Sequence, residues 1–229
     1  FDADGICDAC RSAAYKRRVD WNSRAMEWKT LVSWAKAEAK TRDNAYDCVA
    51  AVSGGKDSTW IVLKLIEAGV RPLAISFEPN MMTATGQKNL ENLQRFCDLI
   101  QIKKNRETYR KIAKHTFKTV GDHEHPNHVG IFVSTAREAA IRNIPLIFFG
   151  ENPQEEYGGP NDKARRSKFL DRRWVAEFGG LLGLRITDVM ASLGLSEEDV
   201  AIYTYPPSFS DANTAAVFLG YFFPWDARK

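Results

Sequence analysis

The segment with the clearest chemical pattern is residues 53–58, which read SGGKDS. Two adjacent glycines let the backbone point several N–H groups into one concavity, and a helix that follows adds the positive end of its dipole. Lys56 supplies a mobile positive charge, and the hydroxyls of Ser53 and Ser58 can donate hydrogen bonds to phosphate oxygens. The segment therefore predicts an anion-binding loop.

Asp57 is the residue of this loop whose charge does not favour phosphate. We expect it to cap the following helix or to help hold Mg²⁺. An ordinary strand-to-helix turn, with Asp57 as its cap, is the alternative interpretation of the same six residues. The spacing does not match the Walker A pattern G-x-x-x-x-G-K-[ST].

Apolar runs and helical periods alternate around this loop. We expect strands at 46–52, 71–77, 100–104 and 144–150, and helices at 58–68, 85–99, 107–120 and 130–142. This alternation predicts an α/β fold with right-handed crossovers and a doubly wound parallel sheet. Ligands bind at the carboxyl ends of the strands in such sheets, which would bring together the loops at 53–58, 77–85 and 150–160.

Composition and charge exclude several classes of protein. The 229 residues, 44% of them hydrophobic, suffice for one full core, and a net charge of +3 is too small to indicate nucleic-acid binding. No apolar run approaches the roughly 18 residues that a membrane span needs, and no secretory signal is visible. Four unevenly spaced cysteines do not form a disulfide framework, so we expect a cytoplasmic protein.

The SGGKDS loop resembles the SGGxDS motif of the PP-loop ATP pyrophosphatases, and it has the strand-loop-helix context of that superfamily. This resemblance implies an adenine nucleotide alpha hydrolase-like fold that cleaves ATP between its α and β phosphates. The loop would hold pyrophosphate while AMP is transferred to the substrate. The residues implied to bind the nucleotide are Ala51, Ser53, Gly54, Gly55, Lys56, Asp57, Ser58, Ser76, Phe77 and Gly150.

Two of these residues, Lys56 and Asp57, together with Glu151 and Asn152, are the candidate catalytic residues. Glu151 and Asn152 directly follow an apolar strand, which places them at the mouth of the expected cleft, although a capped turn would also explain a polar residue there. Glu151, Asp57 or Glu155 could ligate Mg²⁺ between the phosphates. Phe77 fits a plain core position as well as a nucleotide contact.

A narrower resemblance, to the N-acetyl sugar amidotransferase family, runs across nearly the whole chain. It is carried by residues 1–10, 89–93, 121–122, 128–132, 144–147, 150–160 and 219–222, of which GENPQEEYGGP at 150–160 discriminates best. The resemblance implies conversion of a sugar acetamido group to an acetamidino group, in lipopolysaccharide O-antigen and pseudaminic or legionaminic acid-type pathways. ATP would adenylate the amide oxygen, and a separate glutaminase subunit would supply ammonia.

The cysteines agree with a separate glutaminase. Cys48 is expected in a buried strand and Cys97 in a helix, so no nucleophilic cysteine with a histidine partner is visible. Two other functions remain open: a tRNA-modifying PP-loop enzyme of the thiolation type, and a non-catalytic nucleotide-binding module. The modest charge disfavours the first, and the intact Lys56 and Asp57 disfavour the second.

Cys7 and Cys10 have the spacing of zinc ligands, but one such pair does not complete a tetrahedral site. In the resemblance, Glu124 and Asn127 stand where family members carry a further cysteine pair. His123 and His125 could replace those thiolates in a Cys₂His₂ site. The alternative is two reduced thiols and a solvated histidine-rich turn, and His128 could instead contact substrate or ammonia.

The expected organisation has three parts: a CxxC segment with a helix at about 20–41 (residues 1–45), a PP-loop ATP-binding domain (46–160), and a C-terminal helical and substrate-binding segment (161–229). If the sequence is a fragment, the last part is incomplete. Helices are expected at 186–195 and after Ser196. Within 161–174, Arg165, Arg166, Arg172 and Arg173 could include a clamp for pyrophosphate or a uridine diphosphate group, although a solvated helix face is the default for so charged a run.

Overall fold

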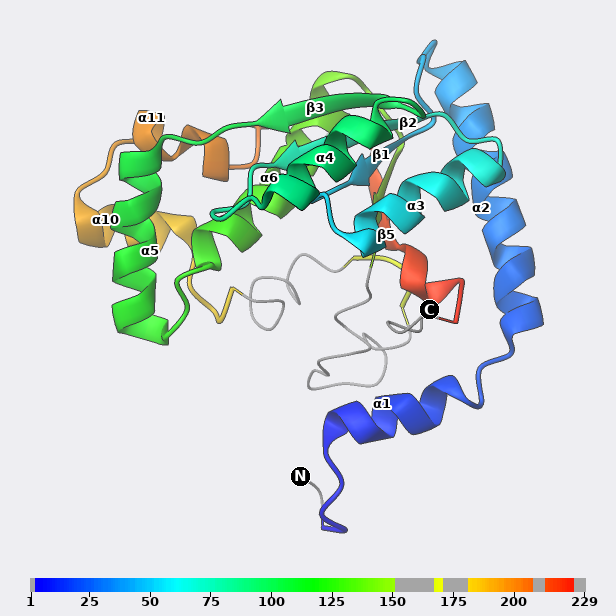
Figure 1. The fold of residues 1–229 in the computed structure, drawn as a ribbon, viewed down its shortest axis with the longest axis horizontal. Coiled ribbons are helices and arrows are strands. Elements are labelled where there is room, and N and C mark those ends of the chain that lie inside the picture. The colour runs from blue at the N-terminus through cyan, green and yellow to red at the C-terminus, as the bar shows by residue number, and fades with distance from the viewer. Residues whose placement is uncertain (1–2, 151–166, 171–180, 208–212, 225–229) are drawn as a thin grey trace.

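The computed structural model describes residues 3–150, 167–170, 181–207 and 213–224 (Figure 1). Its sheet contains β1 (Cys48–Ala51), β2 (Pro72–Phe77), β3 (Asp98–Ile102), β4 (Leu146–Phe149) and β5 (Ala215–Phe218). All neighbouring strands pair in parallel, in the order β3-β2-β1-β4-β5. The described helices are α1 (Asp8–Lys16), α2 (Trp21–Thr41), α3 (Lys56–Glu67), α4 (Ala84–Leu93), α5 (Arg106–Val120), α6 (His125–Ile141), α10 (Ile186–Leu193) and α11 (Glu197–Val200), with 3₁₀ turns η1 (Ala201–Tyr203) and η3 (Leu219–Tyr221).

Helices cover both faces of this sheet. On one face, α2, α3 and α4 pack against side chains such as Ala50, Ala74 and Phe148. On the other face, α6 packs against Val49, Ile75 and the strands beside them. Burial on both faces explains why these strands appear in the sequence as continuous apolar runs. The predicted α/β fold with a doubly wound parallel sheet is confirmed.

The predicted lead-in helix is α2, which begins after Asp20, whose carboxylate accepts hydrogen bonds from the backbone N–H groups of Asn22 and Ser23. Trp28 anchors this helix to the sheet, with its ring 5.6 Å from that of Phe148 and 5.5 Å from that of Phe222. None of the described helices, including this one of 21 residues, has an apolar stretch sufficient to cross a membrane.

The largest errors in the predicted bounds concern two helices, and the strand predicted at 100–104 is Asp98–Ile102. The helix expected at 85–99 ends at Leu93, and β3 already begins at Asp98, so Cys97 lies in the connection rather than in a helix. The histidine-rich turn is shorter than expected because α6 begins at His125. Proline is tolerated in the first turn of a helix, where its missing N–H is not needed, and this allows α6 to include Pro126.

Strand β5 was not predicted, although residues 216–225 are apolar. It pairs with β4 from Leu146↔Ala215 to Phe149↔Phe218, so part of the segment expected to be helical completes the sheet. The short helix α1 was not predicted either. The three domain boundaries themselves remain predictions.

Candidate functional site

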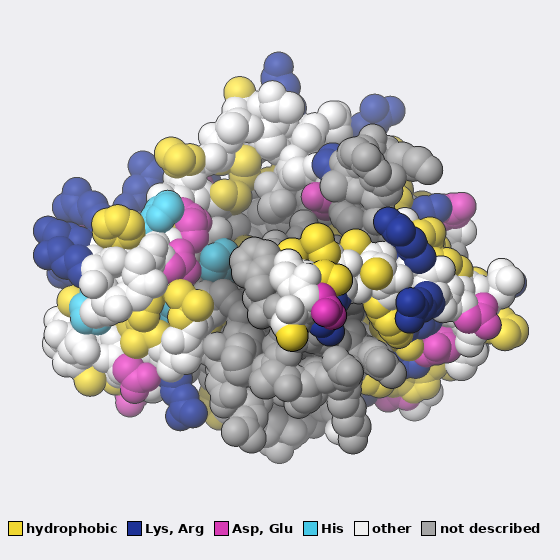
Figure 2. Space-filling model, turned by 90° about the horizontal axis from the view of Figure 1, so that it is seen from below, with side chains coloured by type: hydrophobic (Ala, Val, Ile, Leu, Met, Phe, Trp, Pro, Cys, Tyr) yellow, Lys and Arg dark blue, Asp and Glu magenta, His cyan; other side chains and the backbone are white. Residues whose placement is uncertain are grey.

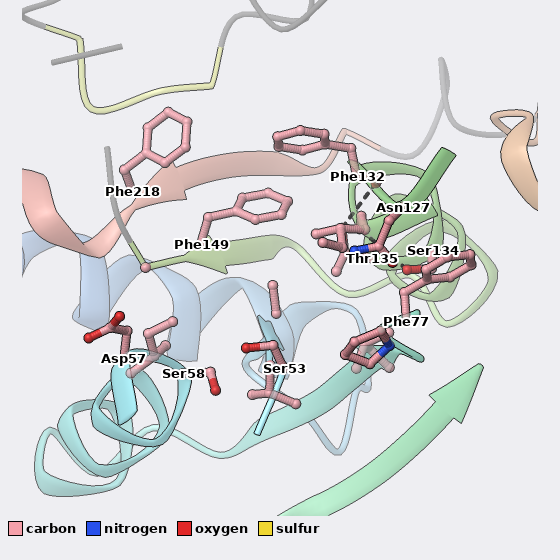
Figure 3. A pocket seen from close by; sticks show the side chains of 17 residues that line it. Ser53, Asp57, Ser58, Phe77, Asn127, Phe132, Ser134, Thr135, Phe149 and Phe218 are labelled. Carbon is pink, nitrogen blue, oxygen red and sulfur yellow. Dashed lines mark hydrogen bonds between the residues drawn. The ribbon is translucent and has the colours of Figure 1, made fainter. Parts of the chain in front are cut away.

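The candidate site lies where the order of the sheet reverses. β1 pairs with β2 on one side and with β4 on the other, so the crossovers leave β1 in opposite directions. Ligands of open α/β sheets bind in the crevice at the carboxyl ends of such strands. A pocket of about 380 Å³ occupies this position, lined by the ends of β1, β2, β4 and β5 and by one face of α6 (Figure 3).

The SGGKDS loop forms one side of this pocket, between the end of β1 at Ala51 and the start of α3 at Lys56. Gly54 has φ +81°, a left-handed backbone that favours glycine. Its carbonyl oxygen accepts a hydrogen bond of 2.8 Å from the side chain of Asn89 in α4. A neighbouring helix therefore fixes the turn, and the loop does not rely on its own residues alone.

The side chains of the loop differ from the expectation in two respects. The residue before α3 is Gly55, which makes no side-chain cap, so the expectation that Asp57 caps this helix is wrong. Asp57 lies in the first turn, 3.1 Å from Lys56 Nζ, and lines the pocket. Ser58 is buried, and its hydroxyl donates to the carbonyl of Gly55 at 3.0 Å. Ser58 therefore supports the loop in this arrangement.

The opposite side of the pocket is mainly aromatic. Phe149 and Phe218, at the ends of β4 and β5, line the pocket on the other side from Ser53, Asp57 and Ser58 (Figure 3). Phe77 closes the pocket at the end of β2. Such walls suit a flat, largely apolar group, and the loop beside them suits an anion.

Helix α6 contributes polar residues that the sequence interpretation did not assign to this pocket: Asn127, Ser134 and Thr135. The hydroxyls of Ser134 and Thr135 donate to the carbonyl of Ile131, within the helix. Asn127 differs, because its buried Oδ1 has no hydrogen-bond partner among the described residues. A buried amide oxygen without a partner marks Asn127 as a ligand-binding candidate. No sequence signal pointed there, since Asn127 was expected in a solvated turn.

The other predicted nucleotide-binding residues are distributed around this pocket. Ala51, Ser53, Asp57, Ser58, Phe77 and Gly150 line it. Gly54, Gly55 and Lys56 lie in the adjoining loop, whereas Ser76 is fully buried and does not line the pocket. Glu151, Asn152, Glu155, Arg165, Arg166, Arg172 and Arg173 lie outside the described residues.

The four predicted zinc ligands do not come together. Cys7 and Cys10 belong to the start of α1, and Figure 1 shows α1 well separated from the start of α6, where His125 lies. His125 is buried, with Nε2 bonded to the carbonyl oxygen of Leu184 at 3.0 Å, and burial lowers the pKa of its ring. Among the described residues, no group of three or more histidine, cysteine or acidic side chains could hold a metal ion.

His123 instead belongs to a surface group. Histidine and acidic side chains gather on one part of the underside of the molecule (Figure 2). His123 Nε2 lies 3.4 Å from Glu124, and His128 Nδ1 lies 3.6 Å from Asp122. The Cys₂His₂ site is therefore not supported, because helix packing carries His125 into the core while Cys7 and Cys10 lie on a separate helix.

Comparisons with known proteins give distant likenesses. No protein-family model and no curated protein sequence matches the chain. Among solved structures, the NMN synthetase from Francisella tularensis has a TM-score of 0.43 and 13% identity, over 85% of this chain and 92% of that one. The NAD⁺ synthetase from Burkholderia pseudomallei has a TM-score of 0.37 and 15% identity, over 97% and 91%.

Proposed function

We propose that this chain is an ATP-dependent amidotransferase of the PP-loop type, the synthetase subunit that adenylates a sugar acetamido oxygen and lets ammonia replace it. One observation carries the proposal: the SGGKDS loop, with Gly54 in a left-handed turn fixed by Asn89, adjoins an aromatic pocket at the switch point of the sheet. Such a loop would hold phosphate groups beside a pocket that suits a nucleoside.

The residues present fit MgATP. The backbone N–H groups of residues 53–58 and the ammonium of Lys56 would hold the β and γ phosphates. Asp57 would offer Mg²⁺ a carboxylate, the oxygen donor that this ion prefers. Phe77 and Phe149 would contact the adenosine, and the unpartnered amide oxygen of Asn127 would accept a hydrogen bond from it.

In the proposed reaction, the acetamido oxygen of the sugar attacks the α phosphorus of ATP, and pyrophosphate leaves. Ammonia then adds to the activated carbon, and AMP departs with the former amide oxygen, leaving an acetamidine. Activation is necessary because an amide oxygen is a poor leaving group, and positioned donors must stabilise the tetrahedral stage.

The resemblance in the sequence supports the choice of acceptor and partner. We propose a nucleotide-linked or free N-acetyl sugar of surface-polysaccharide biosynthesis as substrate, and a separate glutaminase subunit as the source of ammonia. Cys48 and Cys97 agree with a separate glutaminase, since Cys48 is fully buried and burial raises the pKa of Cys97 to about 11. Neither is an activated thiol of the kind that glutamine hydrolysis needs. We place this reaction in the cytoplasm, where ATP is available.

The decisive experiment follows the oxygen atom. The chain is supplied with MgATP, ammonium and a diacetamido sugar whose acetamido oxygens are ¹⁸O, with a co-expressed glutaminase and glutamine as a second arm. We expect pyrophosphate release, ¹⁸O in AMP, and a product that has exchanged one oxygen for an NH group. Pyrophosphate release without ¹⁸O in AMP would contradict adenylation of the amide. RNA-dependent turnover with a steep salt dependence would favour the tRNA-modifying alternative.

A further inference from the structure

A second pocket, of about 680 Å³, opens beside the first at the same edge of the sheet. It is built from the segment 78–82 that follows β2 and from the segment 104–113 that follows β3 and begins α5. The two pockets are adjacent, because Pro79 lines both. A molecule bound in the second pocket would therefore lie next to one bound in the first.

Lys104 is the central cation of this second pocket. Its Nζ lies 5.1 Å from the centre of the Phe77 ring and 4.5 Å from that of Tyr109, and it donates one hydrogen bond to the carbonyl of Glu78. An ammonium has three donors, so Lys104 has further donors available to a ligand, as far as the described residues show. Partial burial lowers the pKa of this amine, so the site carries a desolvation cost that an anion would relieve.

The side chains that line the pocket include three cations and two carboxylates, and Arg110 Nη2 pairs with Glu107 at 2.8 Å. Lys104 and Arg106 are the remaining cations of the lining, and Glu78 is the remaining carboxylate. Glu124, which does not line the pocket, also acts on the charge of Lys104. Two cations that line a recess beside the first pocket suit a ligand with at least one negative charge.

Tyr109 adds a second and independent sign of a missing ligand. Only 4% of this residue is exposed, it lines the pocket, and its hydroxyl has no hydrogen-bond partner among the described residues. Buried hydroxyls normally have a partner, whether protein, water or ligand. On the opposite wall Met81 is 84% exposed, which offers an apolar surface to the body of a ligand.

We propose that this pocket binds the anionic group of the acceptor substrate, through Lys104 and Arg106, while the acetamido group reaches the nucleotide in the first pocket. The identity of this ligand as the acceptor substrate rests on the proposed function. The binding of an oxyanion rests on the pocket itself. Two sources share this chemistry: the diphosphate of a nucleotide-linked sugar and the carboxylate of a free sugar acid. A neutral N-acetyl sugar lacks it.

Calorimetry with three probes tests the site. UDP-N-acetylglucosamine supplies a diphosphate, N-acetylneuraminic acid a carboxylate, and N-acetylglucosamine no charge. The variants are Lys104→Met and Arg106→Gln, with Lys103→Met as a matched control, because Lys103 is the exposed neighbour in the same loop and does not line the pocket. Binding of MgATP to every variant is measured in parallel, both as a check of folding and as a test of the first pocket.

We expect one of the two anionic probes to bind wild type and Lys103→Met equally, and to bind Lys104→Met and Arg106→Gln at least about tenfold more weakly, as the loss of a charged hydrogen bond predicts. The probe that binds identifies the source of the anion. The site is overturned if neither anion binds, if the neutral sugar binds as well, or if the pocket variants bind like wild type. Failure of MgATP binding in wild type would instead contradict the proposed function and leave the anion data independent.

Discussion

A Cβ atom built on Gly54 would stand 2.3 Å from the carbonyl oxygen of Gly86. The SGGKDS loop and the first turn of α4 thus touch through two glycine backbones, and Asn89 in the same helix donates to the Gly54 carbonyl at 2.8 Å. Since the neighbour is backbone, it cannot rotate aside as a flexible side chain would. The sharp turn of the loop is therefore set by a helix about thirty residues further along the chain as well as by the local preference for glycine.

This contact predicts that Gly54→Ala is severely disruptive. A left-handed backbone costs a non-glycine residue about 1–2 kcal/mol, and the steric shift adds about 1–3 kcal/mol. We expect unfolding in urea to report a loss of about 2–5 kcal/mol, and calorimetry to show no binding of MgATP.

Gly121→Ala is the matched control. Gly121 also has a positive φ, +75°, but a Cβ there would meet nothing within 4 Å. It should cost only the backbone contribution, about 1–2 kcal/mol, and leave MgATP binding intact. If Gly54→Ala behaves like this control, the contact with Gly86 does not shape the loop.

Lys56 should be needed for turnover and not for folding. Its side chain is 62% exposed and lies in the first turn of α3. An exposed charge of this kind contributes within about 0.5 kcal/mol to stability, whereas removal of a positioned donor to transition-state charge slows reactions by about 10²–10³-fold. We expect Lys56→Met to melt at the same temperature as wild type and to release pyrophosphate about 10²–10³-fold more slowly.

The control for Lys56 lies on the same helix. Lys64 pairs with Glu67 at 2.7 Å, near the C-terminal end of α3 and away from the loop. Lys64→Met removes the same charge and should keep wild-type turnover. Equal activity of Lys56→Met and wild type would remove the proposed role of the loop.

The sheet and the loop could be predicted from the sequence because their signals are local. The run before Ser53 is apolar enough to be a buried strand, and SGGKDS contains its own turn residues. Strand β5 could not be predicted in this way. Its four residues, Ala215–Phe218, include two alanines, and they become a strand by pairing with β4, nearly seventy residues earlier.

The part of the pocket that α6 lines could not be predicted, for a related reason. Asn127 and Phe132 reach the site because α6 packs closely on β2, and this approach is not encoded in any short pattern. His125, which was predicted as a zinc ligand, is instead buried, with Nε2 bonded to the carbonyl oxygen of Leu184. Site residues could thus be predicted where a single loop supplies them. They could not be predicted where the packing of a helix decides which of its faces points inward.

The packing of α6 on β2 predicts that one substitution changes stability in opposite directions in two backgrounds. A Cβ on Gly130 would lie 2.3 Å from two atoms of the Phe77 ring. We expect Gly130→Ala to destabilise wild type, because overpacking of about 1–3 kcal/mol exceeds the gain of about 1 kcal/mol in helix propensity. In a Phe77→Ala background all the ring atoms are gone, including Cδ1 at 2.7 Å, so Gly130→Ala should be stabilising by up to about 1 kcal/mol.

Urea unfolding of the four proteins gives this double-mutant cycle. A coupling near zero, with the same effect of Gly130→Ala in both backgrounds, would mean that α6 can shift to accommodate the methyl group. Because Phe77 also lines the pocket, MgATP binding is expected to weaken in both variants that lack the ring.

His125 predicts how stability depends on pH. Burial is the main cause of its lowered pKa, opposed by the hydrogen bond to the Leu184 carbonyl and by the charge of Asp122. The unfolded chain therefore takes up a proton as pH falls below the ordinary value of 6.5, while the folded chain does so only at lower pH. This contribution to stability is complete above about pH 6.5 and is lost as pH falls toward the folded pKa, by up to about 1.4 kcal/mol per pH unit.

Thermal melts of wild type between pH 7.5 and 5.5 should show this loss, and His125→Gln, whose amide can still donate to Leu184, should show less of it. His123→Gln, at an exposed histidine two residues away, should keep the wild-type dependence, and the assignment to His125 is wrong if both variants follow wild type.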